Sequence, residues 1–169
     1  MGLKSYQRTG VLTKSDLKAR GLIPLIERLQ SGPVAIVECI ENIPCNPCVE
    51  ACPRHAIMIK GNLTETPQVE FSQCNGCGTC ISQCPGLAIF VVNYGYSSKE
   101  ATVSLPYELL PRPVPGERVV GLDRSGKRVC EGRIVKVLEK EFQNHCAVVT
   151  VAVPKKLWND VRGIRLKKR

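Results

Sequence analysis

The sequence predicts an α+β fold, in which a two-fold pseudo-symmetric, cysteine-rich module carries a basic N-terminal arm and an appended small antiparallel β domain. Eight of the ten cysteines fall into two runs, and each run ends in Cys-Pro and is followed by a strand-like segment. The C-terminal third instead alternates apolar and polar residues between turn signals. We therefore divide the chain into an arm with a short helix at 1–31, the module at 32–95, a Pro-rich linker at 96–116 and the β domain with a basic tail at 117–169.

The size of the chain limits what it can bury. A chain of 169 residues with 5% aromatic residues forms one ordinary core or two small ones, and metal clusters can staple small cores. The longest apolar stretch, 146–153, is far too short to span a bilayer. No apolar signal region follows the first residues, so we expect a cytoplasmic protein whose thiols stay reduced and available to metals.

The net charge of +9 is unevenly distributed. Residues 1–30 hold six basic and two acidic side chains, and residues 101–169 hold fifteen and seven. Residues 31–100, with all eight grouped cysteines, hold three basic and six acidic ones. The basic ends indicate either a solvated surface or a docking surface for acidic protein partners. Nucleic-acid binding is disfavoured, because no stripe of stacking aromatic residues accompanies the charge.

The N-terminal elements follow from local patterns. Within the arm, Ser15 or Asp16 is a candidate helix cap. Apolar residues at helical spacing predict a helix over 22–29, which Gly32-Pro33 ends. The apolar run 34–37 predicts a buried strand that leads into the first cysteine run.

The remaining elements of the module repeat. Each half consists of a strand, a cysteine loop, a short helix and a second strand. The predicted helices are 49–52 and 79–84, and the predicted strands are 56–59, 68–71 and 88–92.

The C-terminal third is predicted to contain short strands joined by turns. Asp123 to Gly126 form a turn signal between the first two strands. The predicted strands are 118–122, 129–138, 146–153 and 161–166, with a brief helix at 155–160.

The two cysteine runs are the strongest functional signal. The second run reads Cys74-x2-Cys77-x2-Cys80-x3-Cys84-Pro85, a spacing typical of iron–sulfur proteins. The first run reads Cys39-x5-Cys45-x2-Cys48-x3-Cys52-Pro53, so only its first gap is longer. Zinc sites use a longer spacer between Cys pairs, which makes zinc a poor fit.

Residues 34–92 resemble bacterial two-cluster ferredoxins in Cys45, Cys48, Cys52-Pro53 and the full second run. The resemblance implies two 4Fe-4S clusters, each of which takes its last ligand from the Cys-Pro of the other half. The implied ligands of cluster 2 are Cys74, Cys77, Cys80 and Cys52, and those of cluster 1 are Cys45, Cys48, Cys84 and one more residue.

The fourth ligand of cluster 1 does not follow from the regular spacing of the cysteines. Regular spacing places it at Asn42, and an amide is a poor ligand for iron. Cys39 lies three residues earlier, and the loop 40–44 is long enough to bring it back. We expect Cys39 to be the ligand; the alternative is a 3Fe-4S cluster held by Cys45, Cys48 and Cys84.

More narrowly, residues 32–48 are similar to the small iron–sulfur subunit of multisubunit FAD-dependent dehydrogenases of the dye-linked proline dehydrogenase type. This resemblance implies a subunit without a catalytic site of its own, which relays single electrons between FAD-containing dehydrogenase subunits and an external acceptor. It also favours Cys39 as a ligand. The alternatives are a stand-alone ferredoxin-type carrier and a redox-sensing nucleic-acid-binding regulator.

Other residues have supporting or minor expected roles. Gly76 and Gly78 are expected to bring backbone N–H groups towards sulfur. Cys130 and Cys146 lie in strand-like contexts and are expected to be buried, inert thiols. His55 is expected to face solvent, and no nucleophile–base pair or phosphate-binding loop is present in the sequence.

Overall fold

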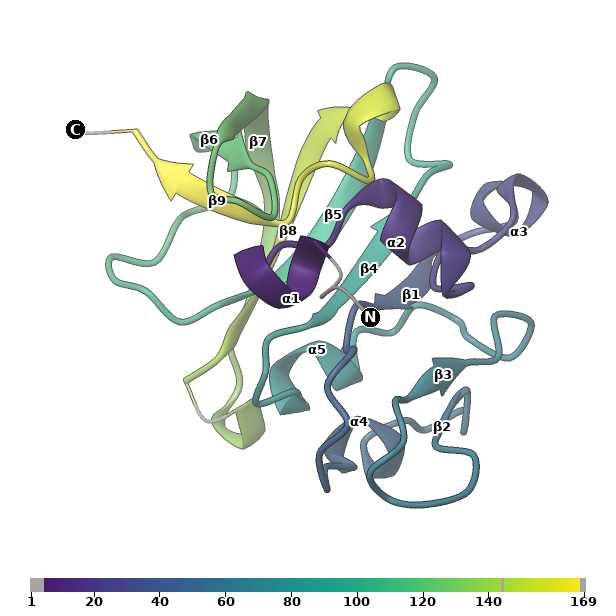
Figure 1. The fold of residues 1–169 in the computed structure, drawn as a ribbon. Helices are drawn as coiled ribbons and strands as arrows, with labels where there is room; N and C mark the ends of the chain where they lie inside the picture. Colours follow the sequence, from purple (N-terminus) through teal and green to yellow (C-terminus); the bar gives the residue numbers. More distant parts are fainter. Residues whose placement is uncertain (1–4, 144, 168–169) are drawn as a thin grey trace.

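The computed structural model describes residues 5–143 and 145–167 of the chain. Its main feature is a seven-stranded antiparallel sheet in the order β1-β4-β5-β8-β7-β6-β9, and a separate pair β2-β3 lies near the cysteine loops (Figure 1). The strands are β1 Val34–Val37, β2 Ile57–Met58, β3 Gln68–Val69, β4 Ile89–Asn93, β5 Glu100–Tyr107, β6 Arg118–Leu122, β7 Arg128–Leu138, β8 Ala147–Pro154 and β9 Gly163–Leu166.

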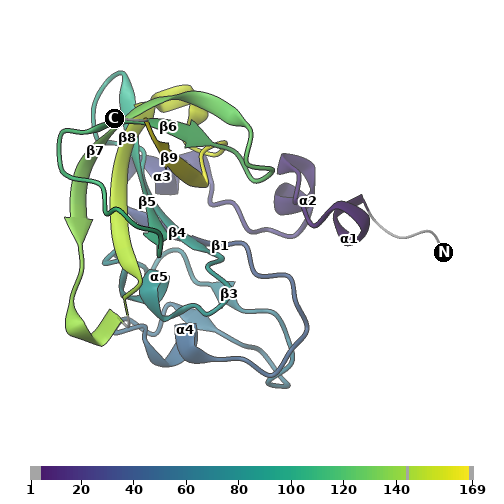
Figure 2. The same ribbon diagram turned by 90° about the vertical axis from the view of Figure 1, so that its left-hand side faces the viewer.

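The helices are short. They are α1 Ser5–Thr9, α2 Lys14–Ala19, α3 Ile26–Gln30, α4 Pro47–Glu50 and α5 Thr79–Gln83, with 3₁₀ turns η1 Glu141–Gln143 and η2 Lys155–Leu157. In both views α4 and α5 lie at the end of the molecule opposite β6 and β9, and α1 projects to one side in Figure 2. None of the helices in the described part of the chain is long and apolar enough to cross a membrane.

Two N-terminal expectations need correction. The cap of α2 is Thr13, whose side chain accepts a hydrogen bond from the Asp16 N–H, while the Asp16 carboxylate accepts from the Thr13 N–H. This reciprocal pair is a capping box, and Asp16 is its fourth residue rather than the cap. The helix expected over 22–29 begins only at Ile26. Pro24 explains the delay, because a proline disfavours helical geometry in the residue before it.

The strand predictions agree with the structure in type and place. Val34–Val37 and Arg118–Leu122 have the predicted bounds, and the other predicted strands differ only at their ends. The two strands between the cysteine runs are the most shortened, with two residues each in place of four. The molecule is thus mostly antiparallel sheet with a few short helices, which is compatible with the predicted α+β class.

The prediction of a linker at 96–116 is wrong for its first half. Strand β5 (Glu100–Tyr107) pairs with β4 through Thr102, Val103 and Ser104, and with β8 over its full length. Pro106 suggested a connecting segment, because proline rarely occurs inside a sheet. It lies at the last position but one of β5, and the buried side chains of that strand outweigh the lost N–H donor. The module and the C-terminal strands therefore share one sheet.

The antiparallel pair β1–β4 separates two apolar clusters. Val34 and Ile36 on β1 face the larger cluster, which also contains Val151 and Ile164 of the C-terminal strands. Ala35 and Val37 face the smaller cluster, which contains Cys48, Cys52 and Cys80. Alternate residues of a strand point to opposite faces, so four consecutive apolar residues serve both clusters. The cysteine site is thus built on one face of β1–β4, and the C-terminal strands cover the other.

Candidate iron–sulfur centres

The fold gathers the eight grouped cysteines into two quartets. Cys39, Cys45, Cys48 and Cys84, the first quartet, line one hollow. Cys52, Cys74, Cys77 and Cys80, the second quartet, line another. Both hollows are open in part to solvent, and each is lined by cysteines of both runs. The structure therefore brings together the two sets of residues that the sequence analysis proposed as ligands.

Each cysteine run contributes to both quartets, and a short helix lies where the run passes from one quartet to the other. Helix α4 starts with Pro47 at its first turn, where proline costs no hydrogen bond, and it carries Cys48 into the first quartet. Cys52 follows just after the end of α4 and lines the second hollow. In the second run, α5 carries Cys80 into the second quartet, and Cys84 at its C-cap lines the first. In each run, therefore, the last cysteine lies just after a short helix and lines the hollow of the other quartet.

Position 42 does not supply a thiol-like donor to the first quartet. The Asn42 side-chain amide donates to the Thr64 carbonyl at 3.3 Å and fixes the loop there. Cys39, three residues earlier, lies beside the first hollow with Cys45 and Cys84. The geometry therefore places Cys39 where the fourth donor of this quartet is needed.

Backbone N–H groups donate to three of the cysteine sulfurs. Ala35 N–H donates to Cys74 Sγ at 3.3 Å, and Ala56 N–H donates to Cys52 Sγ at 3.2 Å. Ala88 N–H donates to Cys84 Sγ at 3.4 Å. Such bonds stabilise negative charge on sulfur and raise a cluster's reduction potential. These three donors are alanines, and the expectation that Gly76 and Gly78 help to bring N–H groups towards sulfur stays a prediction.

Gly76 has a different role. It has a φ of +68°, and a Cβ at this position would lie 2.4 Å from Pro33 Cβ. A side chain cannot fit there, so the second cysteine loop packs its backbone directly against the turn that precedes β1. Gly78, with a φ of +83°, starts α5 in the left-handed region.

Burial makes one thiol in each quartet harder to ionise. Burial, together with the neighbouring Cys77 and Cys74, raises the pKa of Cys80 to about 12. Burial and the nearby Cys84 raise the pKa of Cys48 to about 11. Thiolates packed this closely need positive charge between them, which a metal centre supplies.

The donor geometry fits a multi-iron cluster. In the described part of the chain, no three His, Cys, Asp or Glu side chains lie close enough together to hold one metal ion. A lone zinc needs its donors at one point. Each quartet instead brings four thiols, drawn from both cysteine runs, to one partly open hollow, and four thiolates are the donor set of a 4Fe-4S cluster.

Sequence reasoning missed Arg28, which fastens the second cysteine loop. Its guanidinium donates to four backbone carbonyls, with donor–acceptor distances between 2.6 and 3.1 Å, and these belong to Phe71, Gly32, Pro33 and Cys74. One side chain of α3 therefore ties the start of the second run to the turn before β1. No sequence pattern marks it, because an arginine on a short surface helix is ordinary.

The remaining candidates lie outside the quartets. Cys146 is 3% exposed, as expected, whereas Cys130 is only half-buried. His55 is exposed, as expected, and has a φ of +50°. Of the apolar residues near the runs, Ile57, Ile81 and Ile89 belong to the core cluster that contains the cysteines.

Comparison with known proteins agrees with this geometry. Residues 38–88 match the family model described as a 4Fe-4S dicluster domain. The chain is 42% identical over 53 residues to the ferredoxin-type protein NapF of Haemophilus influenzae, an alignment that covers 30% of each chain. It is 35% identical over 68 residues to an uncharacterised ferredoxin, MJ0155, of Methanocaldococcus jannaschii, and this covers 40% of each. No solved structure is significantly similar to the chain.

The matched region spans less than half of this chain and of both relatives. Together with the quartets, it shows that residues 38–88 contain a ferredoxin-type iron–sulfur module. Such a module implies electron transfer.

Proposed function

We propose that this chain is an electron-transfer subunit that relays single electrons between an FAD-containing dehydrogenase partner and an acceptor. In this proposal the first quartet and the second quartet each hold one 4Fe-4S cluster. When bound, the clusters supply one-electron chemistry, so that two of them can accept the two electrons of a flavin in turn. The protein's own residues hold the clusters, shield them and set their potentials.

The observation that carries the proposal is the exchange of ligands between the quartets. Cys48 on α4 and Cys52 just after that helix belong to different quartets, so one short segment of chain joins the two sites. Cys80 and Cys84 make the same connection through α5. Two cofactors linked so closely form a relay rather than two independent sites.

A basic surface at the far end of the sheet supports a dedicated partner. Glu131 on β7 is shared by Arg118, Arg128 and Lys167, whose nitrogens lie 3.9, 3.6 and 2.7 Å from its carboxylate. Arg118 is 77% exposed, and three cations around one carboxylate leave a positive surplus. This surface suits an acidic patch on a partner subunit, with an affinity that falls as salt rises.

Isolation of the chain from its native host tests the proposal. We expect it to co-purify in fixed stoichiometry with an FAD-containing protein, measured by released flavin and by mass spectrometry of the complex. The substrate of that partner should bleach the visible absorbance of both clusters. A monomer with no flavoprotein, after gentle isolation at low salt, would contradict the proposal.

A stand-alone ferredoxin-type carrier is the second candidate, and the names of both relatives favour it. A carrier binds several redox enzymes reversibly, and salt weakens each complex. A single stoichiometric complex that survives gel filtration would decide against it.

A further inference from the structure

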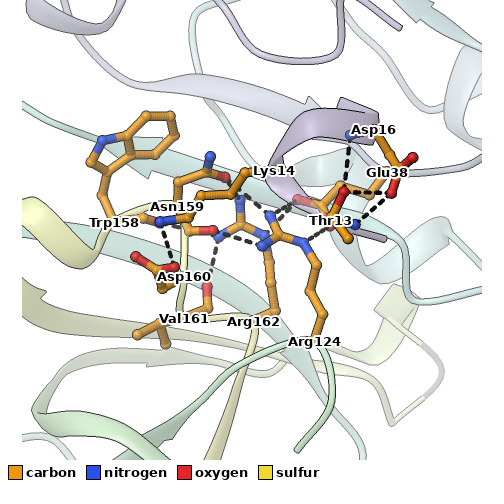
Figure 3. A network of polar contacts seen from close by, with 10 residues as sticks. All are labelled: Thr13, Lys14, Asp16, Glu38, Arg124, Trp158, Asn159, Asp160, Val161 and Arg162. Atoms are coloured by element: carbon orange, nitrogen blue, oxygen red, sulfur yellow. Dashed lines mark hydrogen bonds and ion pairs between the residues drawn. The ribbon is translucent and has the colours of Figure 1, made fainter. Parts of the chain in front are cut away.

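A buried carboxylate lies one residue before Cys39. The Glu38 side chain is 6% exposed and follows directly after β1. Its carboxylate accepts hydrogen bonds from Nε and Nη2 of Arg124, both at 2.7 Å, and from Nε of Arg162 at 2.7 Å (Figure 3). Burial alone favours the neutral acid, but the two guanidiniums outweigh it and hold the Glu38 pKa below its usual value. Residues far along the chain therefore fix Glu38 in place.

The two arginines are themselves held by the C-terminal segment. Asn159 Oδ1 accepts from Nη2 of both, and Arg162 also donates to the carbonyls of Trp158 and Val161. The Arg162 guanidinium lies over the Phe90 ring, 4.9 Å from its centroid. In the described chain no buried side-chain nitrogen or oxygen lacks a hydrogen-bond partner. With Glu38 included, every buried polar side-chain atom of the network therefore has a hydrogen-bond partner.

This network adjoins two thiols of the first quartet. Glu38 is covalently joined to Cys39, and its N–H donates to the Ala88 carbonyl at 2.8 Å. The Ala88 N–H donates in turn to Cys84 Sγ. Cys39 and Cys84 both line the first hollow, whereas among the described residues the hydrogen bonds of Glu38, Arg124 and Arg162 reach no cysteine of the second quartet.

The irregular first run needs such an anchor. Between Cys39 and Cys45 the described chain forms neither helix nor strand, and this gap is three residues longer than in the regular run. Ordering a longer loop costs more conformational entropy. The second run begins instead at Cys74, whose carbonyl Arg28 already holds.

We propose that Glu38, Arg124 and Arg162 are positioning residues for Cys39, so that the C-terminal strands hold the fourth ligand of the first cluster. The inference rests on the proposed function, in which Cys39 is that ligand. In this inference the C-terminal third, through Arg124 and Arg162, helps to position a ligand of the first cluster.

The test is Glu38→Gln in the full chain, isolated anaerobically with its clusters. The loss of charge-assisted bonds raises the population with Cys39 displaced by about ten- to a hundred-fold. We expect the variant to lose about one iron per chain and to show a three-iron signal in electron paramagnetic resonance, while the second cluster's signal keeps its wild-type intensity. Arg124→Gln, which leaves Arg162 on Glu38, should show a smaller effect in the same direction and decides the matter where Glu38→Gln fails to fold.

Two control variants separate positioning from general loss of stability. Glu131→Gln makes the same change at an exposed carboxylate with three cationic neighbours, and it should keep all the iron. Leu105→Ala weakens the core without touching the network. A three-iron signal of equal size in Leu105→Ala would overturn the proposal.

Cys39→Ala distinguishes this inference from the proposed function. If Cys39→Ala gives the three-iron signal and Glu38→Gln and Arg124→Gln do not, the positioning role is refuted and the cluster assignment stands. If Cys39→Ala keeps the wild-type iron content and signal, Cys39 is not a ligand, and both fail.

Discussion

Replacing Arg28 by methionine should release the second cysteine loop. Methionine retains an unbranched aliphatic stem like that of arginine but lacks the guanidinium. The substitution therefore leaves four backbone carbonyls without their donor. Hydrogen bonds to a charged group contribute about 1.5–3 kcal/mol each, but partly exposed carbonyls regain water. Because Arg28 is half-buried, we expect a net loss of about 2–4 kcal/mol, or roughly 30- to 1000-fold in the population of the open loop.

The assay for Arg28→Met is the rate of iron release to a ferrous chelator under anaerobic conditions, followed by visible absorbance. Release from the second cluster should accelerate by at least about tenfold, and the first cluster should then be lost more slowly. Arg28→Lys, which keeps the charge but cannot reach four carbonyls, should fall between. The matched control is Arg54→Met, because Arg54 lines the same hollow, is exposed and makes no hydrogen bond among the described residues. Equal release rates for Arg28→Met and wild type would refute the reasoning.

Three further outcomes follow from the geometry. Gly76→Ala should abolish the second cluster and leave the first with altered stability, because its Cβ would overlap Pro33; iron counts and electron paramagnetic resonance measure this, and a full second-cluster signal would contradict it. Removing the clusters with a chelator should unfold the loops around α4 and α5 while much of the β signal in far-ultraviolet circular dichroism persists, because the larger apolar cluster contains none of the eight grouped thiols as a buried member; complete loss of that signal would show that the sheet depends on the clusters. In the protein with clusters bound, iodoacetamide should label Cys130 before Cys146, since Cys146 is 3% exposed. The labelling rate should rise with pH because the thiolate is the reacting form, and the rise should come at a higher pH than for an ordinary thiol because burial raises the pKa of both thiols. Mass spectrometry that finds Cys146 labelled first would contradict this.

Short-range patterns predicted most of the secondary structure, and the resemblance to two-cluster ferredoxins predicted how the thiols divide between the quartets. Val34–Val37 and Arg118–Leu122 both contain Val, and the first also contains Ile; these residues favour strands. Strand β5 was missed because its proline and flanking turn residues are local signals for a loop. Its pairing with β8 is a long-range contact, which no window of sequence contains.

Residues that act at a distance were equally invisible in the sequence. Arg28 reaches Cys74 across 46 positions, and Arg162 reaches Glu38 across 124. Each is an ordinary arginine in a chain with 24 basic residues, and only the fold shows which of them bind carbonyls or a buried carboxylate. The excess of basic residues in the C-terminal third indicated a surface for partners, but two of those residues are directed inwards.

The inward pair, Arg124 and Arg162, links the C-terminal strands to the start of the first cysteine run. In the regular second run Cys74, Cys77 and Cys80 follow one another at two-residue gaps, whereas in our proposal the stretched first run takes a ligand, Cys39, from outside the usual spacing. Strands β1 and β4 face the quartets on one side and the C-terminal strands on the other, so a network anchored beyond β6 can reach Glu38 at the end of β1. In our proposal the appended strands and the irregular cysteine spacing therefore belong together, and in the full chain Glu38→Gln should leave the second cluster bound more firmly than the first.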